Sequence, residues 1–156
     1  MGNICRSPTA EGVFRAVAER AGIARWLFID SAGTGGWHIG EPPDRRAQTA
    51  ASRRGYDLAA LRARQVSAED FRRFGWIFAM DEENLRILQQ LRPDDYTGHV
   101  GLFLDLVPDS DLREVPDPYF GGAEGFEHVL DLIERASEAL VRDLRQRAPG
   151  LGTTSE

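Results

Sequence analysis

Residues 2–14 read GNICRSPTAEGVF, a compact turn that runs into the start of a helix. Ser7 is a favourable N-cap, and Pro8 suits the first helical position. Backbone N–H groups in such a turn can converge on an anion, and the helix dipole favours negative charge there. The guanidinium fork of Arg6 matches phosphate oxygens. The stretch therefore predicts a phosphate-binding loop, whereas the plainer interpretation is a capped helix with one surface arginine.

Helices and short apolar segments alternate along the rest of the chain. Apolar periodicity and turn residues predict helices at 8–21, 45–54, 67–71 and 122–147, and strands at 26–29, 76–80 and 99–104. A further helix is expected directly after Asp81, which can act as its N-cap. Such alternation is typical of a parallel sheet covered on both faces. We expect one three-layer α/β/α domain with a short parallel sheet over residues 1–148, followed by a flexible tail at 149–156.

Composition excludes several functional classes. The 156 residues carry a net charge of −6, and no uncharged apolar run approaches the length of a membrane span. Residues 1–80 have 12 Arg and 8 acidic residues, and residues 81–156 have 7 Arg and 17 acidic residues, which disfavours a nucleic-acid platform. The three scattered histidines predict no metal site, and we expect no cofactor. A lone Cys5 without a visible export signal indicates the cytoplasm.

Motifs along most of the chain resemble those of the low-molecular-weight protein tyrosine phosphatases. The phosphate loop of that family contains Cys, five residues, Arg and then Ser or Thr, and often continues Ser-Pro-Thr-Ala-Glu-Gly. Residues 2–14 match the end of this pattern without a gap. Further similar segments follow in order at 30–38, 62–65, 80–85, 115–119 and 125–127. The resemblance implies a phosphoric monoester hydrolase with a four-stranded parallel sheet.

The main departure from the family pattern is at the start of the sequence. The nucleophilic cysteine of the family precedes the position of Met1, so we expect this chain to lack that cysteine and the apolar strand before it. Cys5, which adjoins Arg6, corresponds to the second loop cysteine of the family. Either Met1 is an internal methionine of a longer protein, or the truncation is real. We favour the first explanation because loss of an interior strand would leave both neighbouring strands unpaired.

The resemblance implies that a tyrosine-phosphorylated protein or a small aryl phosphate is hydrolysed through a phospho-cysteine. Arg6 would hold the phosphate oxygens, Asp117 would act as general acid and then base, and Ser7 would stabilise the thiolate leaving group. Substrate or phosphate would contact six further residues: Gly2, Asn3, Ile4, Cys5, Trp37 and Tyr119. Ser31 would support the loop, and Pro118 would stiffen the segment that carries the acid.

Several alternatives remain open on the sequence alone. Asp117 is also an ordinary turn residue before proline, and the alternative for Ser31 is that it only terminates a strand. Leu61 replaces a histidine that supports Asn3 in many relatives, so support of Asn3 must rest more on Ser31 or water. Apolar Ile4 favours an aryl phosphate over the phosphoarginine of a related branch. A phosphate-binding pseudophosphatase or a non-functional fragment is the alternative function, and nothing indicates the oligomeric state.

Overall fold

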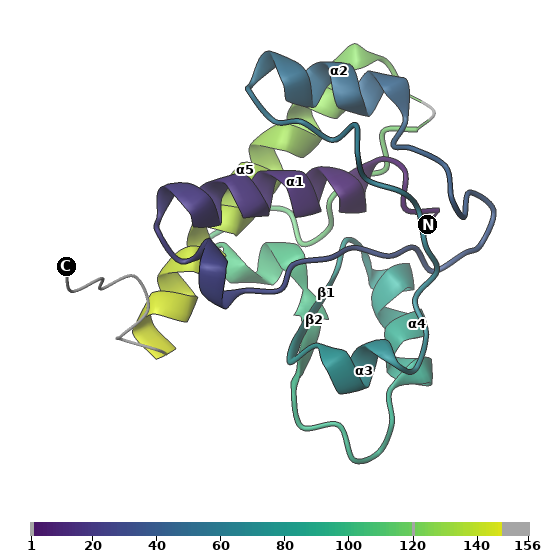
Figure 1. The fold of residues 1–156 in the computed structure, drawn as a ribbon, viewed down its shortest axis with the longest axis vertical. Helices are drawn as coiled ribbons and strands as arrows, with labels where there is room; N and C mark the ends of the chain where they lie inside the picture. The colour runs from purple at the N-terminus through teal and green to yellow at the C-terminus, as the bar shows by residue number, and fades with distance from the viewer. Residues whose placement is uncertain (1, 120, 148–156) are drawn as a thin grey trace.

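The computed structural model describes residues 2–119 and 121–147 (Figure 1). Its elements, in chain order, are α1 (Arg6–Arg20), η1 (Ala24–Trp26), α2 (Arg45–Arg53), α3 (Asp70–Arg73), β1 (Trp76–Ala79), α4 (Glu82–Leu91), β2 (His99–Leu102), η2 (Phe103–Leu106) and α5 (Ala123–Arg147), where η denotes a 3-10 helix. Met1 and the predicted tail at 149–156 lie outside the described residues.

The sheet lies between two helical layers, as the sequence predicts. β1 pairs in parallel with β2, with Trp76 opposite His99 and Ala79 opposite Leu102. The side chains of Trp76 and Phe78 pack on the larger core, to which α1, α2 and α5 contribute. On the other face, Ala79 and Leu102 pack against residues of α3 and α4. The expected α/β/α architecture with a short parallel sheet is therefore confirmed.

Local sequence explains where most helices begin and end. The side chain of Asp81 accepts a hydrogen bond from Asn84 N at 2.8 Å, so Asp81 caps α4 as predicted. Gly55 follows α2 with φ 87°, a left-handed conformation that favours glycine. The predicted elements at 45–54, 76–80 and 122–147 are confirmed with small shifts at their ends.

Two sequence predictions are wrong. Residues 26–29 do not form a strand: η1 ends at Trp26, and the chain then continues without strand pairing until Gly33 forms an isolated bridge with Gln65. A strand is defined by backbone hydrogen bonds to a neighbouring strand, and residues 26–29 have none. Among the described residues, β1 pairs only with β2. The first helix also begins before Pro8, because Cys5 rather than Ser7 stands at the N-cap position, without a side-chain cap.

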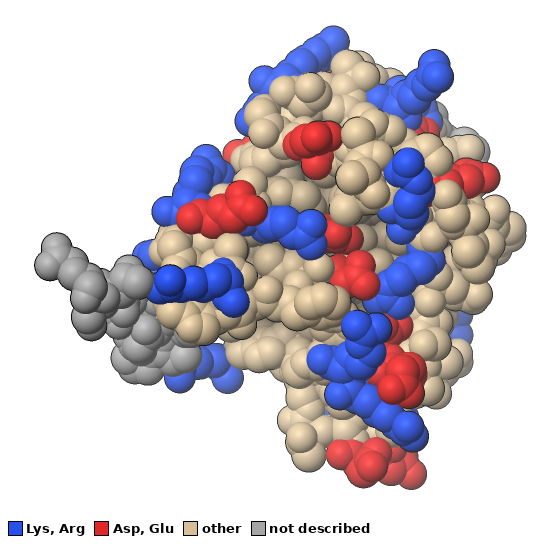
Figure 2. All heavy atoms as spheres, viewed as in Figure 1, with Lys and Arg blue, Asp and Glu red and all other residues tan. Residues whose placement is uncertain are grey.

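The fold mixes charges that the sequence separates. Arg54, from the arginine-rich first half, forms ion pairs with the three carboxylates of Glu127, Asp131 and Glu134 on α5. On the face drawn in Figure 2, arginine and acidic side chains lie beside one another, and neither sign forms a continuous patch. No helix in the described ranges is long and apolar enough to span a membrane.

Candidate active site

The loop before α1 adopts a conformation that few residue types can take. Asn3 has φ 63°, in the left-handed region that Asn tolerates better than most residues. A Cβ atom at Gly2 would lie 2.4 Å from Cδ2 of His38, so only glycine fits while His38 keeps its position. The carbonyl oxygen of Ile4 accepts a hydrogen bond from Asp44 N at 2.8 Å. The loop is therefore held from both sides by residues distant in sequence.

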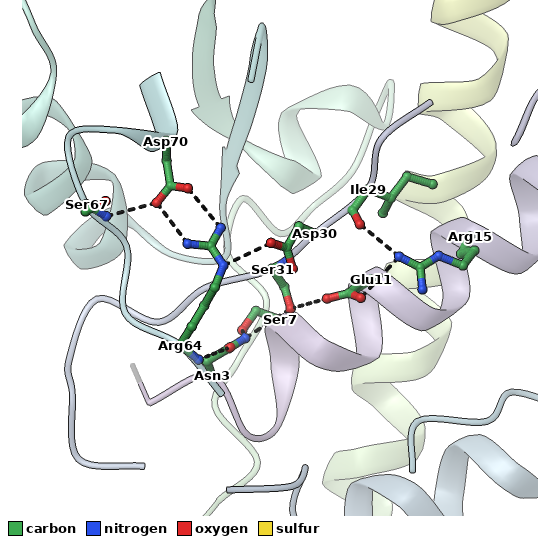
Figure 3. Close-up of polar contacts among 10 residues, drawn as sticks. All are labelled: Asn3, Ser7, Glu11, Arg15, Ile29, Asp30, Ser31, Arg64, Ser67 and Asp70. Atoms are coloured by element: carbon green, nitrogen blue, oxygen red, sulfur yellow. Dashed lines mark hydrogen bonds and ion pairs between the residues drawn. The ribbon is translucent and has the colours of Figure 1, made fainter. Parts of the chain in front are cut away.

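The side chain of Asn3 joins three segments of the chain, as Figure 3 shows. Its Nδ2 donates to Ser7 Oγ at 2.7 Å and to Ser31 Oγ at 3.1 Å. Its Oδ1 accepts from the backbone N–H of Arg64 at 3.0 Å. Asn3 is only 4 % exposed, so these contacts satisfy a buried amide and fix the turn.

Behind Asn3, the hydrogen bonds continue to a buried carboxylate. Ser31 Oγ donates to Glu11 Oε1 at 2.7 Å, and Arg15 Nη2 lies 3.3 Å from the other oxygen of Glu11. Burial raises the pKa of Glu11, and the Ser31 hydrogen bond only partly offsets this effect. Arg15 also donates to the carbonyl oxygen of Ile29 at 2.8 Å, so α1 fixes the path of the segment after η1 (Figure 3).

Arg6 lies at the base of the loop with its side chain 5 % exposed. Its Nη1 donates to Asp81 Oδ2 at 2.7 Å and to the carbonyl oxygen of Val115 at 2.8 Å. Burial raises the pKa of Asp81, but the Asn84 N–H and Arg6 outweigh it and hold that pKa below its usual value. Among the described residues, only Nη1 of Arg6 has protein acceptors, which leaves the rest of the fork for an anion.

Cys5 does not have the environment of a reactive thiol. Its side chain is buried, with 6 % exposed, in the core that α1 shares with α5. Burial, with the nearby carboxylates of Asp44 and Asp117, raises the pKa of Cys5 to about 12. A thiol with such a pKa is almost entirely protonated near neutral pH, whereas nucleophilic cysteines have lowered pKa values. This environment fits a small buried packing residue.

The opposite rim of the site is formed by aromatic side chains and the predicted acid. Asp117 is exposed, and its Oδ1 accepts a hydrogen bond from Tyr119 N at 3.0 Å. The rings of Tyr119 and His38 are 6.4 Å apart between centroids, and Trp37 is 72 % exposed. Trp37 is therefore a surface residue and not part of the core. Pro118 is buried beneath this rim.

One cavity of about 640 Å³ brings most of the predicted site residues together. Its lining includes ten of the eleven predicted residues: Gly2, Asn3, Ile4, Cys5, Arg6, Ser7, Ser31, Trp37, Asp117 and Tyr119. Pro118 alone of the predicted set is absent from that lining. No group of three or more metal-binding side chains occurs in the part of the chain that the structure describes.

Comparison with known proteins agrees with this geometry. Residues 1–149 match the sequence model of the low molecular weight phosphotyrosine protein phosphatases. The low molecular weight protein-tyrosine-phosphatase YfkJ of Bacillus subtilis is 44% identical over 146 residues, which cover 94% of this chain and 92% of YfkJ. The chain belongs to the low molecular weight phosphotyrosine protein phosphatase family.

Solved structures of this phosphatase family have the same fold. The crystal structure of YfkJ gives a TM-score of 0.88 at 42% identity, covering 95% of this chain and 92% of YfkJ. A protein tyrosine phosphatase from Entamoeba histolytica, with Hepes in its active site, gives 0.90 at 37% identity and 94% coverage of both chains. A Drosophila arginine phosphatase gives 0.84 at 30% identity, covering 93% of this chain and 94% of its own.

Three residues around this cavity are absent from the site residues that the sequence predicted. Asp81 was expected only to cap a helix, yet it also forms an ion pair with Arg6. Glu11 reaches the loop through Ser31. Arg46 donates from Nη2 to the carbonyl oxygen of Tyr119 at 2.8 Å and so holds the segment that carries Asp117. All three act across long sequence separations. The one local signal concerns Glu11, which lies among the buried positions of α1.

Proposed function

We propose that the site binds the phosphate of phosphotyrosine, or of another aryl phosphate, at the loop formed by residues 2–7. The observation that carries the proposal is the position of Arg6, which Asp81 and the Val115 carbonyl hold at 2.7 and 2.8 Å beneath a loop fixed by Asn3. A buried, oriented guanidinium at a helix N-terminus is complementary to a phosphate dianion. Trp37 and Tyr119 line the same cavity and offer flat faces to an aromatic ring.

The reaction of this family needs a cysteine thiolate. The residues of this chain would assist that thiolate in two steps. The thiolate attacks phosphorus, an S–P bond forms, and the bond to the aryl oxygen breaks as Asp117 donates its proton to the leaving phenolate. Arg6 balances the charge on the equatorial oxygens. Asp117 then takes a proton from water, whose oxygen attacks phosphorus and releases the thiolate with inorganic phosphate. Ser7 Oγ would donate a hydrogen bond to that thiolate.

We further propose that this 156-residue chain binds the phosphate but does not turn it over. Its single cysteine is Cys5, whose burial and pKa of about 12 disfavour attack. A pseudophosphatase that captures a phosphorylated protein is the second candidate, and the same observation supports it. The tyrosine-phosphorylated partner and the cytoplasmic location remain predictions.

An aryl-phosphatase assay with a parallel binding measurement tests both statements. We expect the chain to bind phenyl phosphate without releasing phenol, and phosphotyrosine peptides to bind more tightly than phosphoarginine peptides. Turnover above that of an Asp117→Asn variant would refute the inactivity of the chain. Failure to bind any aryl phosphate would refute the proposed site.

The N-terminal peptide of the protein from its own cells separates the two candidates. A peptide that extends upstream through an apolar strand into a cysteine next to Met1 would identify the catalytic form. A peptide that begins at Met1 would favour the pseudophosphatase.

A further inference from the structure

A second, smaller cavity of about 250 Å³ lies between α2 and the start of α5, two helices that Figure 1 shows beside each other. Three arginines, Arg45, Arg46 and Arg53, line this cavity, which we call the arginine pocket. Its lining also contains one carboxylate, that of Glu127, and no other charged side chain. Positive charge is therefore in excess here, although the net charge of the chain is −6.

Two of these arginines have no partner in the part of the chain that the structure describes. Arg45 and Arg53 are exposed, and neither forms a hydrogen bond, an ion pair or a ring contact with a described residue. The carboxylate of Glu127, by contrast, pairs with Nη2 of Arg54 at 2.7 Å. The only acidic group of the arginine pocket is thus already neutralised, and the charges of Arg45 and Arg53 remain available to an anion.

The spacing along α2 lets both side chains act on one anion. Arg45, Thr49 and Arg53 recur every four residues, so they share one face of the helix. The two arginines are about 12 Å apart along the helix axis, and Thr49, which also lines the pocket, lies between them. Long arginine side chains can close on an anion above the Thr49 hydroxyl, which can itself donate a hydrogen bond.

Arg46 connects the arginine pocket to the active site. Its Nη2 donates to the Tyr119 carbonyl oxygen at 2.8 Å, and its guanidinium carbon lies 5.5 Å from the centre of the Tyr119 ring. The same carbon lies 4.9 Å from the ring centre of Phe126, which lines the arginine pocket. Tyr119 lines the larger cavity. The arginine pocket therefore lies just across the Tyr119 rim from the proposed place of the phosphorylated ring.

We propose that the arginine pocket binds an acidic side chain of the same phosphorylated protein whose phosphate binds at residues 2–7, so this inference rests on the proposed function. An extended peptide advances about 3.3 Å per residue, so a residue two to four positions from the phosphotyrosine can cross the rim. Exposed ion pairs are too weak to hold a free ion. A carboxylate tethered to a bound phosphate, however, has a high effective concentration at the pocket. The pocket thus selects phosphotyrosines with acidic neighbours.

The probes are phosphotyrosine peptides with Glu at the second, third and fourth positions either before or after the phosphotyrosine. Matched peptides carry Gln at the same positions. We expect the Glu peptide of one of these two series to bind the 156-residue chain about fivefold more tightly than its Gln counterpart. This advantage should shrink as the salt concentration rises. Fluorescence anisotropy measures the affinities, and equal binding of Glu and Gln peptides in both series would overturn the proposal.

Two double variants of the chain locate the effect. Arg45→Ala with Arg53→Ala should abolish the Glu advantage and leave the affinity for phenyl phosphate unchanged. The matched control is Arg86→Ala with Arg135→Ala, which removes the same charge from two exposed arginines that line neither cavity. All four positions lie on helices, where alanine is well tolerated. An equal loss of the Glu advantage in both double variants would contradict the proposal.

Two small ligands separate the remaining outcomes. Phenyl phosphate has no flanking residues, so a failure of the unmodified chain to bind it would refute the proposed function. Normal binding of phenyl phosphate with equal binding of Glu and Gln peptides would refute the role of the pocket alone. Inorganic phosphate tests for a free anion. Saturable NMR shifts at the amides of Thr49 and Ala123, without any Glu advantage, would assign the pocket to that ion and overturn the proposal.

Discussion

The two ends of the cavity are ordered in opposite ways. At the loop end, polar side chains are buried and satisfied: Asn3, Arg6 and Glu11 are 4, 5 and 7 % exposed, and each has protein partners. At the far end, apolar side chains are exposed, with Phe28 at 67 %. Buried polar groups must find partners within the fold, so the loop end is ordered by its own hydrogen bonds, with part of the Arg6 fork left for an anion. Exposed aromatic surface, by contrast, gains stability only when something covers it.

Among the substitutions considered, removal of the Arg6 side chain should cause the largest loss of phosphate affinity, and this loss should be confined to the loop end of the cavity. Because Arg6→Ala removes the charge that faces the phosphate, we expect affinity for phenyl phosphate to fall about 100-fold. Arg6→Lys keeps a charge without the fork and should lose about tenfold. NMR titration measures both losses, and the exposed residue Arg86, changed to Ala, is the control. Unchanged affinity in Arg6→Ala would show that the phosphate binds elsewhere.

Asn3 tests how much the polar network contributes to loop order. Asn3→Ala loses three hydrogen bonds at a left-handed φ, so we expect the free energy of unfolding to fall by about 3 kcal/mol. Asn3→Gly keeps the φ without strain and should lose about 1 kcal/mol less. Urea denaturation measures both. Asp109, with φ 61°, controls for conformation alone, and an equally large loss in Asp109→Ala would contradict a role for the network.

Glu11 adds a pH dependence to the loop end. Its raised pKa means that the folded state holds the proton more tightly than the unfolded state does. This stabilisation is complete below the usual Glu pKa and is lost as pH rises through the raised value. As pH rises through this window, the free energy of unfolding of the unmodified chain should fall relative to that of Glu11→Gln, because glutamine does not titrate. Urea denaturation at several pH values measures the difference, and a parallel trend in Glu138→Gln would contradict this origin.

Arg46 should have the smallest effect, because it is exposed and acts through the backbone of the acid segment. Loss of its hydrogen bond to the Tyr119 carbonyl should loosen the rim and weaken phenyl phosphate binding two- to threefold. The neighbouring exposed residue Arg45, changed to Ala, should have no effect. Equal affinities of the Arg46→Ala chain and the unmodified chain would show that the rim is held by other contacts.

The sequence predicted the loop end better than the far end for a physical reason. Residues 2–7 form their turn locally, and the N-terminus of α1 follows within the same stretch, so contiguous sequence carries the signal. The Arg6–Asp81 pair spans 75 positions and depends on how β1 and α1 meet, which no local pattern reports. Asp81 was therefore predicted only in its local role as a cap.

The wrong prediction at 26–29 has the same origin. Trp-Leu-Phe-Ile has the composition of a buried strand, but a strand also requires a partner for its backbone. Leu27 and Ile29 do pack against the core, so the apolar pattern correctly indicated a wall of the interior. The apolar pattern could not indicate that residues 27–29 line a cavity instead of pairing with a strand.

The most direct test of the proposed function is a titration of the ¹⁵N-labelled chain with phenyl phosphate, with released phenol followed in the same samples. We predict saturable shifts at the amides of residues 3–7 and at Nε of Arg6, with no phenol released. Shifts confined to surface arginines, or an unperturbed loop at saturating ligand, would contradict phosphate binding at this site. Phenol release that disappears in Asp117→Asn would contradict the claim that this chain binds without turnover.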